Sequence, residues 1–573
     1  MKAKKWLIGL LSLACISASS FGVIGCGGSS GSQTVQGWGS IDDSFQSGDL
    51  NNPQFNDGQS GPEGHSHYYV ETVTPPTCTQ QGYSVYTCAC GDTRMGNYVN
   101  KIDHVFDQND FCSLCLSTEG VAYRLSIGGT SAAVGFYTGT ATNVVIASTY
   151  QGVPVTSIGD MAFLESSSLT KVVIPDSVTS IGGMAFYNCS SLTSIEIPDG
   201  VMNIGDMAFY NCSSLTKIVI PDSVTSIGDS AFSGCSSLTS IEIPDGVMSI
   251  GNGMFSGCSS LTSIEIPDGV MSIGGYAFSG CSSLISIKIP DGITSIGNGM
   301  FSGCSGLTSI EIPDGVMSIG GYAFSGCSSL TSIEIPDGVT SISNGMFSGC
   351  SSLTSIEIPD SVTSIGEDAF LGCDNLQWNI HDDGKYLGRG NNPYWALIDV
   401  ETSYQSTTLT IHKDVELLAE DALCWVYIFT IINIEESNMI YTSIEGNLYT
   451  KDEKTLVRYA AGKTNTSFTV PDVVTSIEGY AFAYCMDLTN VKIPDSVTSI
   501  DVSAFYACRS LTSVVISDSV TSIGNGAFSR CSSLTSIEFK GTIAQWNAIE
   551  KGQGWHDGVP ATEVVCSDGK AEL

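Results

Sequence analysis

A phrase of 23 residues recurs along the chain with the same order of hydrophobic and polar positions. One copy, LTSIEIPDGVMSIGGYAFSGCSS at 261–283, alternates apolar and polar residues, and this alternation predicts a short strand with one buried face. The Pro-Asp-Gly that follows predicts a turn, after which the second half of the phrase leads to the next copy. The apolar residues of this copy are expected to point inward: Leu261, Ile264, Ile266, Val270, Ile273, Phe278 and Cys281.

The phenylalanine of the phrase marks the period. The phrase returns at Phe482, Phe505 and Phe528, and residues 408–423 form a degenerate copy with Leu423 in the phenylalanine place. A unit of this length cannot bury its own apolar face, so it must stack on its neighbours. The sequence therefore predicts an α/β-type repeat solenoid of 23-residue leucine-rich repeats, with short parallel strands and about 14 turns. The regular block carries its phenylalanines at Phe163, Phe186, Phe209, Phe232, Phe255, Phe278, Phe301, Phe324, Phe347 and Phe370.

The amino-acid sequence of the repeat resembles that of one family. The repeat is similar to the BspA-type leucine-rich repeats of bacterial surface proteins, which also occur in surface proteins of some protist parasites. The similarity lies in the segment IPDSVTSIG, followed by AF, two further residues and CSSLTS. Residues 123–159 resemble the family's N-terminal cap, 441–463 its characteristic insertion, and GTIAQWNAI with Trp555 and Cys566 its closing segment. The resemblance covers about residues 120–570. It implies adhesion to proteins or cells at the cell surface, with no shared catalytic residue and no particular ligand.

The first residues predict entry into the secretory route. Lys2, Lys4 and Lys5 precede an apolar stretch that is too short to span a membrane permanently. The segment ends in Val-Ile-Gly-Cys, which resembles a bacterial lipobox and implies lipid attachment at Cys26 and a place on the outer face of the cell envelope. An ordinary signal peptide cut near Ala18 is the alternative.

The composition along the chain divides it into segments. These are a signal peptide (1–25), a flexible lipid-anchored stalk (26–64), a Cys-rich module (65–118), an N-terminal solenoid cap (119–160), regular repeats (161–373), irregular repeats with insertions (374–465), further repeats (466–540) and a C-terminal cap (541–573).

The charge balance excludes one class of partner. The chain has 22 Lys and Arg against 58 Asp and Glu, for a formal net charge of −36. Removal of residues 1–25 deletes three lysines and no acid, which makes the charge 19 − 58 = −39. A nucleic-acid-binding protein needs clustered basic residues to displace counterions from phosphates, so nucleic acid is not an expected partner.

Glutamates recur at the outward position of the predicted strand. A docking strip for a basic protein segment is one interpretation, and a solvated surface that prevents aggregation is the other. Calcium is disfavoured because a flat column lacks a looped cage of oxygen ligands. The column also holds Val219 and Lys288, and its candidate binding residues are Glu196, Glu242, Glu265, Glu311, Glu334 and Glu357. The Asp after each Pro is interpreted as turn chemistry.

The cysteines fall into two groups. Twelve recur at the repeat period, and we expect them to be free thiols buried in the core, because side chains on one ladder point the same way and bridge poorly. Cys88, Cys90, Cys112 and Cys115 belong to the Cys-rich module. They suit either a structural zinc site, with His104 as an alternative ligand, or disulfides. No other metal or cofactor is expected.

The sequence gives little support for catalysis. No His lies between residues 160 and 380, so the regular repeats lack a catalytic triad of their own. The insertion carries Tyr386, Tyr394 and Trp395, which form either an aromatic hot spot or packing over the end of the repeats. The predicted function is protein binding and adhesion, not enzymatic. The alternatives are a self-associating surface layer and, less favoured, an active site in the insertions near His381 or His412.

Overall fold

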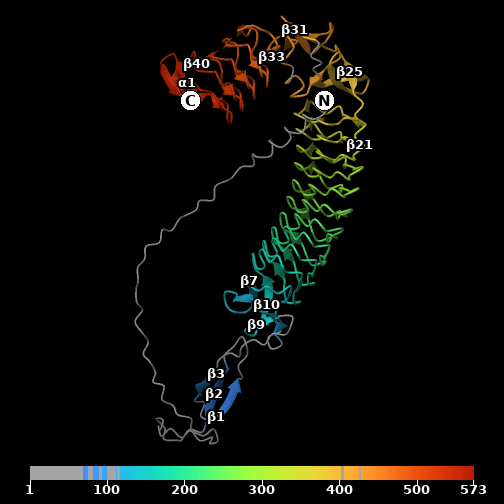
Figure 1. Ribbon diagram of the computed structural model, residues 1–573, viewed down its shortest axis with the longest axis vertical. Coiled ribbons are helices and arrows are strands. Elements are labelled where there is room, and N and C mark those ends of the chain that lie inside the picture. Colours follow the sequence, from blue (N-terminus) through green and yellow to red (C-terminus); the bar gives the residue numbers. More distant parts are fainter. Residues whose placement is uncertain are drawn as a thin grey trace. The chain divides into compact units, whose positions relative to one another are not determined.

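The computed structural model describes residues 69–74, 82–88, 93–99, 111–112, 117–401, 406–424 and 427–573 (Figure 1). In the Cys-rich module it places a three-stranded sheet and a short antiparallel pair. The sheet is formed by β1 (Tyr69–Thr74), β2 (Gly82–Cys88) and β3 (Thr93–Val99), and the pair by β4 (Phe111–Cys112) and β5 (Ser117–Thr118). Residues 1–68, with the predicted signal peptide and stalk, lie outside the described residues.

From β6 (Val121–Leu125) onward the chain is a parallel β-solenoid of about 19 turns with a 23-residue repeat, which confirms the predicted solenoid. The number of turns exceeds the predicted 14 because the caps and insertions add strands to the sheets formed by the repeats. Most coils contribute one strand to a first ladder, at the Ser-Ile-Glu segment predicted as a strand, and isolated bridges continue the ladder through the middle coils, as between Glu242 and Glu265. This ladder comprises β8 (Asn143–Val145), β11 (Lys171–Val173), β13 (Ser194–Glu196), β15 (Lys217–Val219), β21 (Ser332–Glu334), β23 (Ser355–Glu357), β28 (Thr408–Ile411), β30 (Ile431–Ile434), β34 (Ser467–Thr469), β36 (Asn490–Lys492), β38 (Ser513–Ile516), β40 (Ser536–Phe539), β42 (Glu563–Cys566) and β43 (Gly569–Glu572).

A second ladder runs through the Ser-Ile pair that follows the turn. This ladder is not evident in the sequence, because two residues are too few to show a period. Its strands are β6 (Val121–Leu125), β7 (Ala132–Tyr137), β10 (Val153–Ile158) with β9 (Thr149–Tyr150), β12 (Ser180–Ile181), β14 (Asn203–Ile204), β16 (Ser226–Ile227), β17 (Ser249–Ile250), β18 (Ser272–Ile273), β19 (Ser295–Ile296), β20 (Ser318–Ile319), β22 (Ser341–Ile342), β24 (Ser364–Ile365), β35 (Ser476–Ile477), β37 (Ser499–Ile500), β39 (Ser522–Ile523) and β41 (Glu550–Lys551).

The insertions form antiparallel strands that join the second ladder's side of the coils. The first insertion contains β25 (Asn379–His381), β26 (Gly384–Arg389) and β27 (Asn392–Val400), and β27 runs parallel to β29 (Leu417–Leu418) of the degenerate copy. The second contains β31 (Tyr441–Ile444), β32 (Asn447–Thr450) and β33 (Thr455–Arg458), and β33 continues in parallel to β35. In the part of the chain that the structure describes, the one helix is α1 (Ile543–Ala548), capped by Thr542. The returning half of each repeat consists of turns, so the solenoid is of β type.

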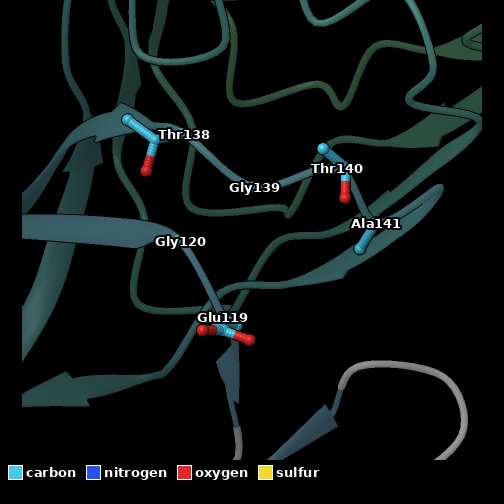
Figure 2. Close-up of a pocket in the computed structure, with 6 residues that line it drawn as sticks. All are labelled: Glu119, Gly120, Thr138, Gly139, Thr140 and Ala141. Atoms are coloured by element: carbon cyan, nitrogen blue, oxygen red, sulfur yellow. The ribbon is translucent and has the colours of Figure 1, made fainter.

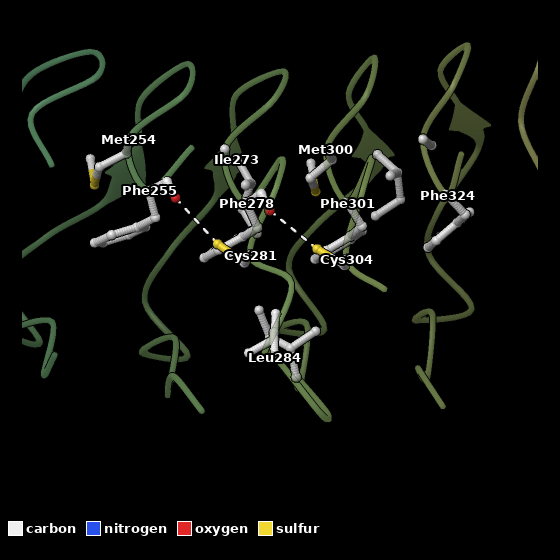
Figure 3. Close-up of a cluster of buried hydrophobic side chains, with 14 of the residues drawn as sticks. Met254, Phe255, Ile273, Phe278, Cys281, Leu284, Met300, Phe301, Cys304 and Phe324 are labelled. Carbon is white, nitrogen blue, oxygen red and sulfur yellow. Dashed lines mark hydrogen bonds between the residues drawn. The ribbon is translucent and has the colours of Figure 1, made fainter. Parts of the chain in front are cut away.

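The interior is a set of stacked identical side chains. The seven residues expected to point inward in the copy at 261–283 are all buried, which confirms the predicted pattern. Phenylalanine rings of successive coils stack, as Phe255, Phe278, Phe301 and Phe324 show (Figure 3). Between Phe163 and Phe370 neighbouring ring centroids lie 5.1 to 5.8 Å apart. Each ring therefore covers the next one, and the core is continuous from coil to coil.

The cysteines of the repeat are buried beside this stack and are free thiols. The Sγ of Cys281 donates to the carbonyl of Phe255 over 3.2 Å, and Cys304 donates to Phe278 over 3.1 Å (Figure 3). Burial raises the pKa of Cys258 and Cys304 to about 12. The thiol thus satisfies a buried carbonyl of the preceding coil while it fills a small apolar space.

The turns require left-handed backbone at two positions in each coil. One of them is held by Gly257, Gly280 and Gly303 in the middle of the array, with φ of 73 to 75°, and by Asn188 and Asn211 nearer its beginning. In the middle of the array, the second left-handed position is tyrosine in one coil and glycine in the next. A Cβ added to Gly299 would lie 2.3 Å from the ring of Tyr276, so the tyrosine of one coil lies where the next coil has glycine.

The structure also bears on membranes. No helix among the described residues is long and apolar enough to cross a bilayer.

The buried thiols make a testable prediction. At pH 8 iodoacetamide should leave Cys258 and Cys304 unmodified in the native chain, because burial and the raised pKa keep them protonated and shielded. The same thiols should react fully in guanidinium chloride. Peptide mass spectrometry of the full chain measures both states, and equal labelling in the two would contradict the buried column.

The left-handed glycines make a second prediction. Gly303→Ala should lower the free energy of unfolding by about 1–2 kcal/mol, because alanine is strained at positive φ although space is available for its Cβ. Gly303→Asn is the matched variant and should cost less, since asparagine already occupies this place at Asn188 and Asn211. Urea denaturation measures both, and an equal cost for the two variants would refute the conformational explanation.

Candidate functional site

The acidic stripe, defined as Glu196, Glu242, Glu265, Glu311, Glu334 and Glu357, lies on the outward side of the first ladder with every member exposed. Adjacent coils align its members directly: Glu334 pairs in register with Glu357, and Glu242 with Glu265. Like charges at this spacing repel by about 1 kcal/mol or less in water, a cost that solvated side chains tolerate. Lys288 interrupts the stripe and pairs with Asp268 at 3.7 Å, both largely exposed.

The aspartates after proline form a second exposed column beside the stripe. In each turn the backbone N–H of the following buried residue closes back on the proline carbonyl, as between Val270 and Pro267 over 3.0 Å. The aspartate stands at the tip of this turn and its side chain faces solvent, as at Asp268 and Asp291. The Pro-Asp turns are formed as predicted, and together the two columns make one side of the array strongly acidic.

The aromatic residues of the first insertion are mostly inside the protein. Tyr386 is 0% and Trp395 2% exposed, and the guanidinium of Arg389 lies 4.2 Å from the centre of the Trp395 ring. Tyr394 alone is partly accessible. The hot-spot prediction is therefore wrong for Tyr386 and Trp395: both side chains, on β26 and β27, are buried in the main apolar core, which is the packing alternative.

Two histidines of the same region share one carboxylate. Nε2 of His381 lies 3.5 Å and Nε2 of His412 3.9 Å from the carboxylate oxygens of Glu435. The His412 ring stacks on Tyr394 with centroids 3.8 Å apart, and burial lowers the pKa of His412. The group lacks a nucleophile and neither histidine lines the hollows described below. Across the described residues, no three His, Cys, Asp or Glu side chains are placed to hold a metal ion.

A hollow of about 320 Å³ lies near the start of the solenoid (Figure 2). Glu119 provides its one ionisable side chain, and Thr138, Thr140 and backbone complete the lining. Nothing in this set forms an acid–base pair or an activated nucleophile, so the hollow has no evident chemistry.

Two further hollows, of about 270 and 280 Å³, flank the joint where the irregular coils meet the second regular block. The apolar core divides there into one cluster spanning 132–460 and another spanning 449–571. Polar contacts cross the joint. Tyr480 donates to the carboxylate of Glu367, and the backbone N–H of Asp368 donates to Asp421 over 2.9 Å.

Arg458 is the central residue of this joint, and the sequence analysis did not single it out. It is 2% exposed, and its guanidinium donates to the carbonyls of Cys424 and Ala483 over 3.2 and 3.1 Å. A lone arginine in an insertion gives no periodic signal. The one sign in the sequence that Arg458 is buried is its position immediately before Tyr-Ala-Ala, a short apolar segment.

For the Cys-rich module, a structural zinc site and disulfides both stay predictions. Cys88 ends β2 and Cys112 ends β4, while Cys90 and Cys115 lie outside the described residues, as does Cys26. The choice between zinc and disulfides in this module is therefore open, and lipid attachment at Cys26 also stays a prediction.

Two ladders of short parallel strands, a stacked interior and outward columns of repeated side chains define a leucine-rich-repeat β-solenoid scaffold. The model of the BspA type leucine rich repeat region matches residues 156–285, 272–388 and 459–550, which together make up more than half of the chain. The chain belongs to this family, as its sequence predicted. No curated protein matches it.

Several solved structures are similar to the chain, and two of them are described as leucine-rich repeat proteins of bacteria. One from Bacteroides ovatus is 26% identical, with a TM-score of 0.43, and the match covers 75% of this chain and 96% of that one. The leucine-rich repeat protein of T. pallidum is 33% identical over 37% of this chain and 88% of its own, with a TM-score of 0.29. The pneumococcal vaccine antigen PcpA is 16% identical over 79% and 87%, with a TM-score of 0.22.

The joint makes a prediction about pH. Burial raises the pKa of Asp421 to about 6, so the folded chain holds this proton more tightly than the unfolded chain. The resulting stability is fully present below about pH 4 and is lost as the pH rises through about 6. Asp421→Asn, which can still accept the Asp368 N–H, should therefore gain about 1–2 kcal/mol over the native chain between pH 4 and pH 7.

Denaturant unfolding at a series of pH values measures this gain. Asp291→Asn is the control, because the Asp291 side chain faces solvent. A constant difference between Asp421→Asn and the native chain across the range would contradict the buried carboxyl.

Proposed function

We propose that the protein is a cell-surface binding scaffold that holds protein partners on the outward face of its solenoid. The observation that carries this proposal is the acidic stripe: six glutamates on one face, exposed and in register, on a frame whose interior is complete without them. Side chains repeated at fixed spacing on a rigid frame suit a partner with complementary charge.

The partner's chemistry follows from the charge. The chain carries 58 acidic against 22 basic residues, so its field attracts basic protein segments and repels nucleic acid and anionic lipid. Contacts of this type are screened by salt over a Debye length of about 10 Å at 0.1 M. Binding should therefore be strongest at low ionic strength.

Placement at the cell surface rests on the sequence. The charged and apolar start, followed by Val-Ile-Gly-Cys, supports export and lipid attachment at Cys26, which would anchor the scaffold to the outer face of the envelope. The glycine- and serine-rich segment that follows suits a tether.

The test is binding of the full chain to immobilised extracellular-matrix and cell-surface proteins at 50 and 500 mM salt. Glu311, Glu334 and Glu357→Gln should weaken binding at least tenfold at low salt and much less at high salt, because the removed charges act through screened attraction.

The matched control changes Glu436, Glu550 and Glu572 to Gln. It removes the same number of exposed charges away from the stripe and should leave binding within about twofold. Equal losses in both variants would assign the effect to net charge and overturn the stripe. Absence of binding, together with concentration-dependent self-association, would favour a surface layer instead.

A further inference from the structure

A column of methionines occupies the corner between the two ladders. The residue after the buried valine or isoleucine of the turn faces solvent in every regular coil and is either methionine or threonine. Successive members are joined through the backbone: the N–H of Met271 donates to the carbonyl of Met248 over 2.9 Å, and Thr225 donates to Met202 over 3.0 Å. The methionine column is Met202, Met248, Met271 and Met317, which are 50 to 61% exposed.

Two of the methionine side chains, Met271 and Met317, lie beside the acidic turns. A Cβ added to Gly292 would lie 3.4 Å from the Sδ of Met271, and one added to Gly338 would lie 2.8 Å from the Sδ of Met317. Each of these glycines follows the exposed aspartate of a Pro-Asp turn, Asp291 or Asp337. The thioethers of Met271 and Met317 therefore rest against the turns of the next coil, each of which carries an exposed aspartate.

The side chains around the methionine column indicate which kind of partner would bind there. A large exposed apolar side chain repeated on one column is unusual for a solvated surface, whereas isolated exposed apolar residues are common. Methionine is flexible and polarizable, so it adapts to varied apolar partners. The flanking aspartates and the acidic stripe add a requirement for positive charge, which disfavours an anionic lipid surface.

The length of the column fits a helix. Met202 and Met317 are five coils apart, which corresponds to about 24 Å at the spacing of neighbouring strands. An α-helix covers that distance with about 16 residues. One apolar stripe along such a helix would meet the methionines while its basic residues face the carboxylates.

We propose that the methionine column and its flanking aspartates are the docking site for a basic amphipathic helix of a protein partner. The inference rests on the proposed function and names the partner's class. It adds an apolar contact to the charge attraction already described.

The test uses two 16-residue peptides of equal charge. One carries lysines with leucines on a single helical face, and in the other each leucine is replaced by serine. At 150 mM salt the full native chain should bind the Leu/Lys peptide at least tenfold more tightly than the Ser/Lys peptide, measured by fluorescence anisotropy. The Leu/Lys peptide should gain helicity on binding, measured by circular dichroism.

The variant changes all four methionines to threonine, the residue that the chain itself uses at Thr225, Thr294 and Thr340, so the fold is expected to be kept. The variant should lose the preference for the leucine peptide to within about twofold and keep its affinity for the serine peptide. The control changes Val173 and Val219, exposed apolar residues of the first ladder, and Ile285, an exposed residue just before it, to Thr and should keep the preference.

The outcomes separate the two proposals. A preference that survives the four-methionine change, or is absent in the native chain, overturns the methionine site. Failure of the stripe variant to weaken binding of natural proteins overturns the proposed function instead. As a second readout, the Leu/Lys peptide should protect Met248 and Met271 from oxidation by hydrogen peroxide, and unchanged oxidation would also overturn the site.

Discussion

Stacking of one coil on the next is the interaction on which the whole structure depends. A single 23-residue coil has no second layer, so its Phe, Leu and Ile side chains are covered only by the same side chains of its neighbours. The ring of Phe278 lies between Phe255 and Phe301, and the thiol of Cys281 satisfies the carbonyl of Phe255. Because each contact joins adjacent coils, the interior tolerates little change and the exterior is left to vary.

The variation that does occur shows how strict the stacking is. Buried methionine alternates with alanine from coil to coil, as in Met254, Ala277, Met300 and Ala323, and an exposed tyrosine alternates with glycine. Larger side chains in one coil are therefore accommodated by smaller ones in the next. On the outside no such limit applies to the Glu, Asp and Met columns. Repetition turns each single outward residue into a continuous surface, and a scaffold of this kind can bind a partner along that surface.

Periodic features could be predicted from the sequence, and single features could not. The spacing of Ile264, Ile266 and Phe278 indicated both the solenoid and the buried face, because the same physical requirement is repeated in every coil. Tyr386 and Trp395 occur once, in an insertion, and nothing in their sequence separates an exposed aromatic residue from a packed one. The second ladder was missed because a two-residue strand shows no alternation. Arg458 was missed because its partners are backbone carbonyls of distant coils.

The central claim is that the 23-residue coil is the unit of stability. Deletion of residues 284–329 removes two complete coils and joins Ser283 to Leu330, which keeps both ladders and the Met/Ala alternation in phase. Deletion of residues 284–317 removes one and a half coils and puts the ladders out of phase. Denaturant unfolding followed by circular dichroism should show a cooperative transition near that of the native chain for the first variant and loss of folded structure for the second. Similar unfolding of the two variants would contradict the account.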